Sequence, residues 1–126
     1  MKEIIGRREW FSIPEFGVDW FRAKIDTGSK SSALHACDIE PFKKDGESWL
    51  RFQTIDGRKC EAAVIFRKGS DRYFIEITVE TVSDQKMDFL VELSDRSQKK
   101  FPLSLGRRDL SRFLVDSEES FLLGKV

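Results

Sequence analysis

The sequence predicts a mostly β protein, a closed β-barrel or sandwich with one short helix near the C-terminus. Three observations lead to this fold class: apolar and polar residues alternate along several short runs, turn residues separate the runs, and one helix-compatible segment follows residue 106. The chain shows no repeat, no low-complexity segment and no Pro/Gly/Ser-rich linker. We therefore expect a single domain over residues 1–126.

Turn signals set the order of the expected elements. Asp56-Gly57 is a strong hairpin-turn dipeptide, and the polar segments 67–72 and 83–86 indicate two further turns. The helix is expected to begin after Gly106. The expected strands cover residues 9–13, 18–25, 49–55, 60–66, 73–82, 87–93 and 101–105, the helix covers residues 107–114, and a final strand covers residues 120–123.

Charge is high but balanced, with 22 lysines and arginines against 22 aspartates and glutamates. A formal net charge of zero gives no electrostatic argument for binding nucleic acid or an anionic membrane. The N-terminal residues lack the apolar region of a signal peptide, and no apolar run approaches the roughly 20 residues that span a bilayer. We therefore expect a soluble, cytoplasmic protein with no nucleic acid and no membrane among its partners.

Metal-ligating residues are few and scattered. A structural zinc site normally takes four Cys or His ligands, and this chain offers only Cys37, Cys60 and His35. It has no HExxH motif and no Gly-rich phosphate loop. We interpret the cysteines as free thiols and His35 as a structural hydrogen-bond donor, although a lone histidine can also bind a metal. The expectation is no metal site and no cofactor.

The segment Ile25-Asp26-Thr27-Gly28 carries the chemistry that we expect. An alternating strand ends in a carboxylate, a hydroxyl residue and a glycine. Two such carboxylates that share one proton can activate water and protonate a leaving nitrogen. Thr27 can brace the loop against a symmetry mate, and Gly28 allows backbone to approach the carboxylate closely. By itself this three-residue match also fits an ordinary turn.

The order of the expected strands, hairpin and helix along the chain strengthens the interpretation of Asp26 as a catalytic residue. Behind the Asp-Thr-Gly loop come a hairpin with its tip near Gly69, an apolar strand that runs into Gly106, and a short helix. A retropepsin subunit has this order of parts. The joint match over nearly the whole chain is more specific than any one part.

The chain resembles a bacterial and archaeal family of retropepsin-like aspartic proteases whose members are labelled ATP-dependent zinc proteases and occur beside or fused to glutamate-ligase proteins. The similarity runs from about residue 4 to residue 124 and is most specific around Asp26. The matching stretches are residues 5–10, 23–36, 93–96, 101–102 and 105–108. We set the zinc and ATP of the label aside, because the residues offer no site for either.

The resemblance implies that Asp26 is the dyad aspartate of a homodimer. The sequence supports this reading, because it contains no second Asp-Thr-Gly or Asp-Ser-Gly. Gly106 and Arg107 are expected to be structural, the arginine tying the helix start to the Asp26 loop through an acidic partner. Asp95 and Asp109 are candidates for that partner. Asp95 and its neighbour Arg96 either line the site or form a surface turn.

The residues after the loop predict an anionic substrate. Retroviral relatives carry acidic residues just after this loop, whereas this chain has Ser29 and Lys30. Further basic residues follow at the expected hairpin tip and helix start. We interpret Lys30, Arg67, Lys68 and Arg108 as candidate clamps for substrate carboxylates, against the alternative of a solvated surface.

Two functions remain open from the sequence. The first is an aspartic endopeptidase that acts on a peptide or protein, with poly-glutamate tails as the expected substrate. The second is a non-catalytic peptide-binding module of the same fold. The intact Asp26-Thr27-Gly28 argues against a β domain with no site at all.

Overall fold

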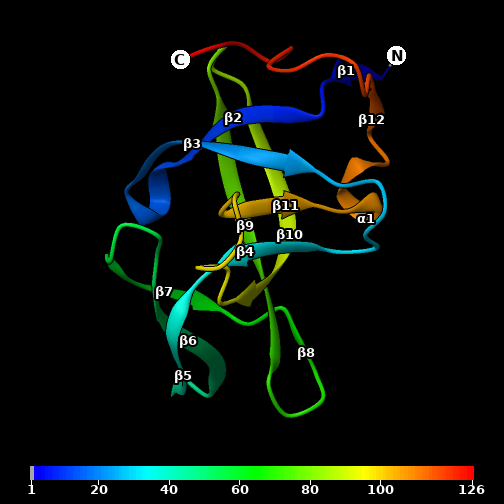
Figure 1. The fold of residues 1–126 in the computed structure, drawn as a ribbon. Helices are drawn as coiled ribbons and strands as arrows, with labels where there is room; N and C mark the ends of the chain where they lie inside the picture. The colour runs from blue at the N-terminus through cyan, green and yellow to red at the C-terminus, as the bar shows by residue number, and fades with distance from the viewer. Residues whose placement is uncertain (1) are drawn as a thin grey trace.

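A computed structural model describes residues 2–126, and Figure 1 shows how the elements are arranged. The first half contains β1 (Glu3–Ile5), β2 (Arg8–Ile13), a 3-10 turn (Pro14–Phe16), β3 (Val18–Ile25), β4 (Ser32–His35), β5 (Cys37–Lys44), β6 (Glu47–Gln53) and β7 (Lys59–Ala63). The second half contains β8 (Phe66–Lys68), β9 (Arg72–Thr81), β10 (Lys86–Ser94), β11 (Leu103–Leu105), α1 (Arg107–Leu110) and β12 (Phe113–Val115).

Six strands close into a barrel. Their order is β10-β4-β11-β3-β2-β9, and pairing between β9 and β10 completes the ring. Strand β8 extends the β9 edge as a hairpin that projects from the barrel (Figure 1). Strands β5, β6 and β7 form a separate antiparallel sheet, and β1 pairs with β12 in parallel. The mostly β fold with one short helix is confirmed.

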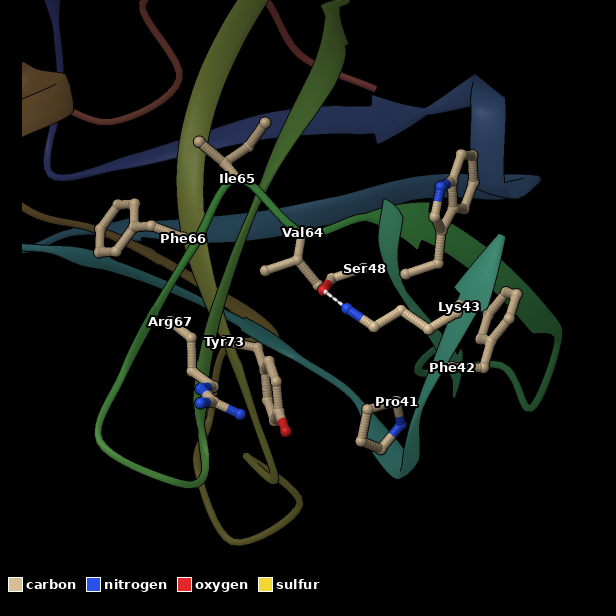
Figure 2. A pocket seen from close by; sticks show the side chains of 10 residues that line it. Pro41, Phe42, Lys43, Ser48, Val64, Ile65, Phe66, Arg67 and Tyr73 are labelled. Carbon is tan, nitrogen blue, oxygen red and sulfur yellow. Dashed lines mark hydrogen bonds between the residues drawn. The ribbon is translucent and has the colours of Figure 1, made fainter. Parts of the chain in front are cut away.

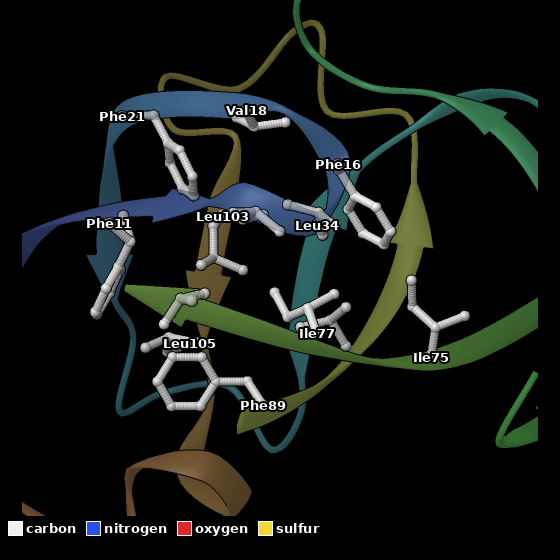
Figure 3. Packing of buried hydrophobic residues seen from close by; sticks show 14 of the residues in the cluster. Phe11, Phe16, Val18, Phe21, Leu34, Ile75, Ile77, Phe89, Leu103 and Leu105 are labelled. Carbon is white, nitrogen blue, oxygen red and sulfur yellow. The ribbon is translucent and has the colours of Figure 1, made fainter. Parts of the chain in front are cut away.

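Side-chain alternation produces the core. On β3, Val18, Phe21, Ala23 and Ile25 face inward while the residues between them are exposed. Figure 3 shows aromatic and aliphatic side chains from several strands meeting inside the barrel. Phe11 and Phe89 meet edge to face, with ring centroids 5.8 Å apart. Each fully buried side chain of this size stabilises the fold by about 1.5–3 kcal/mol.

Both strongest hairpin predictions are confirmed. Strands β6 and β7 pair antiparallel around Asp56-Gly57, and Gly57 adopts a φ of 81° that favours glycine. Strands β9 and β10 pair around the turn at residues 83–86, where Asp84 has a φ of 70°. The predicted turns therefore set these two registers.

Three predicted boundaries are wrong. Residues 120–123 form turns and no strand, because the backbone amides of Leu122 and Leu123 bond to the Glu9 carboxylate rather than to a neighbouring strand. The helix ends at Leu110 instead of residue 114, since the following residues form β12 and pair with β1. The run 60–66 is split between β7 and β8, which belong to different sheets.

Strands β1, β4, β5 and β12 were not expected from the sequence. Strands β1 and β12 have three residues each, and their parallel partners lie 110 positions apart in the chain. Strand β5 has no clear buried face. The three-residue strands β1 and β12 are too short to show the alternation of apolar and polar residues that indicates a half-buried strand, and β5 lacks it.

Candidate active site

Asp26 stands immediately after β3, at the start of a tight loop beside the end of β11. Its amide donates to the Leu105 carbonyl (2.9 Å), and its carbonyl accepts from the Ser29 amide (3.1 Å). Its carboxylate atom Oδ1 accepts from the Gly28 amide (3.1 Å). The Asp26 side chain remains 29% exposed. The loop therefore fixes the carboxylate through backbone bonds and leaves part of it open.

Gly28 is packed closely against the carboxylate that it binds. A Cβ at this position would lie 3.3 Å from Asp26 Oδ1, a tighter contact than most Cβ atoms make. Thr27 and Gly28 are both exposed. The Asp-Thr-Gly loop thus presents an open surface on which a second protein chain or a substrate can lie.

Two cations act on Asp26. Lys24 lies two residues before Asp26, on the exposed face of β3, and its Nζ is 3.8 Å from Asp26 Oδ2. Burial lowers the pKa of the Arg96 guanidinium, and the nearby negative charge of Asp26 partly opposes that effect. Arg96 Nε donates to the Phe101 carbonyl (3.0 Å), which fixes its side chain. Asp26 therefore has two cationic side chains near it, Lys24 and Arg96.

The helix start holds the loop from the other side. The Arg107 amide donates to the Ser29 carbonyl (2.8 Å), and its guanidinium donates to the Thr27 carbonyl (3.2 Å). The predicted acidic partner of Arg107 is wrong, because the guanidinium meets a backbone carbonyl. The Arg108 amide donates to the Lys30 carbonyl (3.1 Å).

A buried network joins the same two segments. The Gly106 amide donates to Ser32 Oγ (3.0 Å), and Ser32 Oγ donates to Asp109 Oδ2 (2.6 Å). The second Asp109 oxygen accepts from the Leu90 amide (3.2 Å). A Cβ at Gly106 would lie 2.5 Å from the Ser31 carbonyl oxygen, so this approach requires glycine. The network places the loop, the helix and β10 relative to one another.

The predicted clamp residues fall into two groups. Lys30 and Arg108 lie beside the Asp26 loop through the backbone bond between them. Arg67 and Lys68 lie on the β8–β9 hairpin, where the Lys68 Nζ sits 5.8 Å from the Phe74 ring centroid. Within residues 2–126, no hydrogen bond or ion pair joins Arg67 to the Asp26 loop, and its partner across the hairpin is Tyr73. The four residues therefore do not form one cluster within a single chain.

Arg67 instead lines a hollow of about 540 Å³ between the hairpin and the β5–β6–β7 sheet (Figure 2). Lys43 lies on the opposite wall and donates to Ser48 Oγ (3.0 Å). Aromatic side chains, including Trp49 and Tyr73, complete the lining. No residue of the Asp26 loop lines this hollow, so it is separate from the candidate active site.

His35 has the opposite hydrogen-bonding role to the one expected. Its Nδ1 accepts a bond from the Arg96 amide (2.8 Å), so the prediction of a donor is wrong at this atom. Asp95 lies 3.8 Å from the same nitrogen, and its bond with Ser97 lowers the pKa of its carboxyl. Within residues 2–126, no three His, Cys, Asp or Glu side chains gather as metal ligands.

The cysteines are separate free thiols. Cys37 and Cys60 are both half-buried and form no disulfide. Burial raises the pKa of both thiols. The raised pKa values favour the protonated thiols over the more reactive thiolates.

Sequence reasoning missed Lys24 and gave Arg96 only an undecided role. The spacing of Lys24 contained a signal, because residues two apart on a strand lie on one face. Arg96 had no comparable signal. It approaches Asp26 from a loop 70 residues away in the chain, where a bond to the Phe101 carbonyl fixes its guanidinium.

Comparison with known proteins now decides the family. Residues 4–125 match the model described as "RimB-like: Retropepsin-like aspartic endopeptidase RimB". The chain belongs to the RimB-like family. It is also similar to a solved protein of unknown function, Lpg0085 from Legionella pneumophila, with a TM-score of 0.83 and 26% identity over 98% of this chain and 99% of that one.

Curated relatives of this RimB-like chain are longer proteins. It is 32% identical to a "Probable alpha-L-glutamate ligase" of Shewanella pealeana and 33% identical to one of Desulfotalea psychrophila, over 98% and 99% of this chain. The chain spans 30% of the length of each. Among residues 2–126, no helix is long and apolar enough to cross a membrane.

Proposed function

We propose that this chain is an aspartic endopeptidase that acts as a homodimer, with one Asp26 from each copy in the catalytic pair. The observation that carries the proposal is that one chain supplies only one of the two aspartates that a catalytic pair requires. One partly exposed carboxylate stands in an Asp-Thr-Gly loop, and the sequence contains no second loop of this kind. Family membership supports the general chemistry, because the matching model describes a retropepsin-like aspartic endopeptidase.

Peptide hydrolysis follows from two carboxylates that share one proton. The ionised Asp26 takes a proton from water, and the water oxygen attacks the scissile carbonyl carbon. The protonated Asp26 gives its proton to the carbonyl oxygen. When the tetrahedral intermediate collapses, the C–N bond breaks and the leaving nitrogen receives a proton from the pair. Thr27 braces the two loops against each other at the two-fold axis, and the Gly28 amide holds the Asp26 carboxylate of its own chain.

The dimer contact that we propose includes β1 and β12. Ile4 and Leu114 are direct partners across this strand pair, and both are more than half exposed, at 52% and 54%. Figure 1 shows β1, β12, α1 and the loop after β3 along one side of the molecule. Unpaired strand edges and an exposed apolar pair favour association with a second copy. An isologous contact on this side would bring the two Asp26 loops together.

Glutamate-rich protein tails are the substrate that we propose. The similar proteins named probable alpha-L-glutamate ligases would supply such tails, and a peptidase would remove them. Lys30 and Arg108 lie beside the Asp26 loop and can pair with substrate carboxylates. Arg67 and Lys68 could join them from the hairpin when substrate is bound.

A peptide-binding module without catalysis is the second candidate. The observation that favours it is the ion pair between Lys24 and Asp26, at 3.8 Å. This pair gives the carboxylate a cationic partner inside a single chain. Such a carboxylate could serve binding alone.

The deciding experiment measures cleavage of glutamate-rich peptides between pH 4 and pH 8. We expect Asp26→Asn to reduce cleavage by about 10²–10⁴-fold, because the water loses its base. A statine-containing peptide should inhibit the parent chain, since it resembles the tetrahedral intermediate. Binding of acidic peptides without any cleavage would support the binding module. Cleavage that persists in Asp26→Asn would overturn the assignment of Asp26.

A further inference from the structure

Cationic side chains surround the buried ring of Phe101. The Arg8 and Arg22 Cζ atoms each lie 5.7 Å from the ring centroid, and the Lys100 Nζ lies 5.8 Å from it. Arg96 Nε donates to the Phe101 carbonyl (3.0 Å). Four positive charges from β2, β3 and the loop before β11 therefore meet at one residue.

A fifth cation links this group to the active site. Lys24 lies directly across the β2–β3 pair from Arg8, and its Nζ is 3.8 Å from Asp26 Oδ2. We call Arg8, Arg22, Lys24, Arg96 and Lys100 the Phe101 cation cluster. Its near end touches the carboxylate that we assign to catalysis.

The cluster has almost no compensating negative charge. Within residues 2–126, Asp26 is the one carboxylate in ion-pair contact with it. Like charges directly opposite in adjacent strands, such as Arg8 and Lys24, destabilise a sheet. The chain as a whole has a net charge of zero, so this local excess is not a general property of its surface. An anionic ligand would relieve the repulsion.

We propose that the Phe101 cation cluster is the subsite that holds the acidic side chains of the substrate next to the scissile bond. The proposal rests on the proposed endopeptidase function and adds a second group of cations to Lys30, Arg67, Lys68 and Arg108. Lys24 receives the carboxylate closest to the reacting bond. Arg22 and Lys100 receive the carboxylates further along the chain.

The geometry suits this role. Phe101 is 8% exposed, so its ring is fixed by the core while cations pack around it. Cations held in this way lose less conformational freedom when a carboxylate binds. Guanidinium groups can also bind carboxylates through two parallel hydrogen bonds. A carboxamide such as glutamine gains neither the charge nor this pairing.

The test compares a glutamate-rich peptide with its glutamine isostere. The double variant Arg22→Gln/Lys100→Gln removes two exposed cations at the ring, and the matched control Lys86→Gln/Lys125→Gln removes two exposed cations elsewhere. We expect the ratio of kcat/KM for the two peptides to fall about tenfold in the first and to change less than about twofold in the control. The charge-preserving variant Arg22→Lys/Lys100→Arg should retain the ratio.

A binding assay separates this inference from the endopeptidase proposal. Fluorescence anisotropy with a labelled hexaglutamate measures Kd on Asp26→Asn chains, where cleavage does not interfere. We expect Arg22→Gln/Lys100→Gln to raise Kd about tenfold at low salt, and added salt to erase the difference. If peptides are cleaved but the selectivity ratio and Kd do not change, the subsite is wrong and the enzyme stands. If Kd changes but no peptide is cleaved, the enzyme proposal fails, and the cluster is a binding site for acidic side chains rather than a subsite beside a scissile bond.

Discussion

Two carboxylates, one on β2 and one just after the neighbouring strand β3, have opposite surroundings. Glu9 on β2 pairs in register with Ala23, which precedes Asp26 by three residues. The Glu9 side chain is fully buried and accepts from the amides of Gly6 (2.7 Å), Leu122 (3.1 Å) and Leu123 (3.0 Å). Asp26 accepts one amide bond and stays 29% exposed.

The difference shows that the surroundings of a carboxylate decide whether it stabilises the fold or can react with a substrate. Three buried donors occupy the Glu9 oxygens, so this carboxylate has little capacity left for a substrate or a water molecule. Glu9 instead fastens the C-terminal segment to the barrel. Asp26 keeps free lone pairs on the exposed side of a rigid loop, which is what a general base requires. The two residues should therefore fail in different ways when they are replaced.

The largest effect on stability is expected from Glu9→Ala. Removal of the carboxylate leaves three backbone amides without their acceptor, two of them from the C-terminal segment. We expect a loss of about 3–5 kcal/mol in the free energy of unfolding, measured by urea denaturation. Asp26→Asn is the matched control and should change the same quantity by less than about 1 kcal/mol. Equal losses in the two variants would contradict the contrast between them.

A smaller loss is expected from Asp109→Ala. This carboxylate accepts from the Ser32 hydroxyl and the Leu90 amide, and it holds the helix start against the Asp26 loop only indirectly. We expect a loss of about 2–3 kcal/mol in unfolding free energy, together with a lower kcat. Asp109→Asn keeps one acceptor oxygen, for Ser32, but loses the one for the Leu90 amide, so it should restore part of both. A kcat that stays at the parent value in Asp109→Ala would show that the network does not position the loop.

The smallest effect concerns a fourth carboxylate, Asp56, in the β6–β7 turn. Hydrogen bonding from Thr54 lowers the pKa of Asp56, and bonds from Arg58 add to this effect. A lowered pKa in the folded state stabilises the fold above the unfolded-state pKa, and that contribution is lost as pH falls through the folded-state value. Thr54→Val should move the Asp56 pKa upward, as read from an NMR titration of its side-chain carbonyl carbon. An unchanged titration would exclude Thr54 as the main cause.

Sequence reasoning reached Asp26 because its signals are local. Alternation along residues 18–25, the Asp-Thr-Gly loop and the Asp56-Gly57 turn all lie within short windows. The family resemblance added the barrel and the order of its parts. These features were enough to predict the fold class and the candidate catalytic residue.

Contacts between distant segments could not be predicted in this way. In the sequence, Glu9 looks like an ordinary charged residue of a strand. Two of the amides that donate hydrogen bonds to its carboxylate lie more than 110 positions away in the chain. The Phe101 cation cluster likewise combines residues from three separate segments. Arg107 was placed at the helix start, but its carbonyl partner depends on how the Asp26 loop folds. These contacts depend on how strands pair and how loops fold in three dimensions, and no short stretch of the sequence indicates either.

The most direct test of the two-chain site is a mixing experiment. Parent and Asp26→Asn chains are unfolded together at a fixed total concentration, refolded, and assayed with a glutamate-rich peptide. If each site needs Asp26 from both copies, an equal mixture retains about one quarter of the parent activity, because only that fraction of dimers has two parent chains. A mixture that retains about one half would mean that each chain acts alone, and it would contradict the shared Asp26 pair.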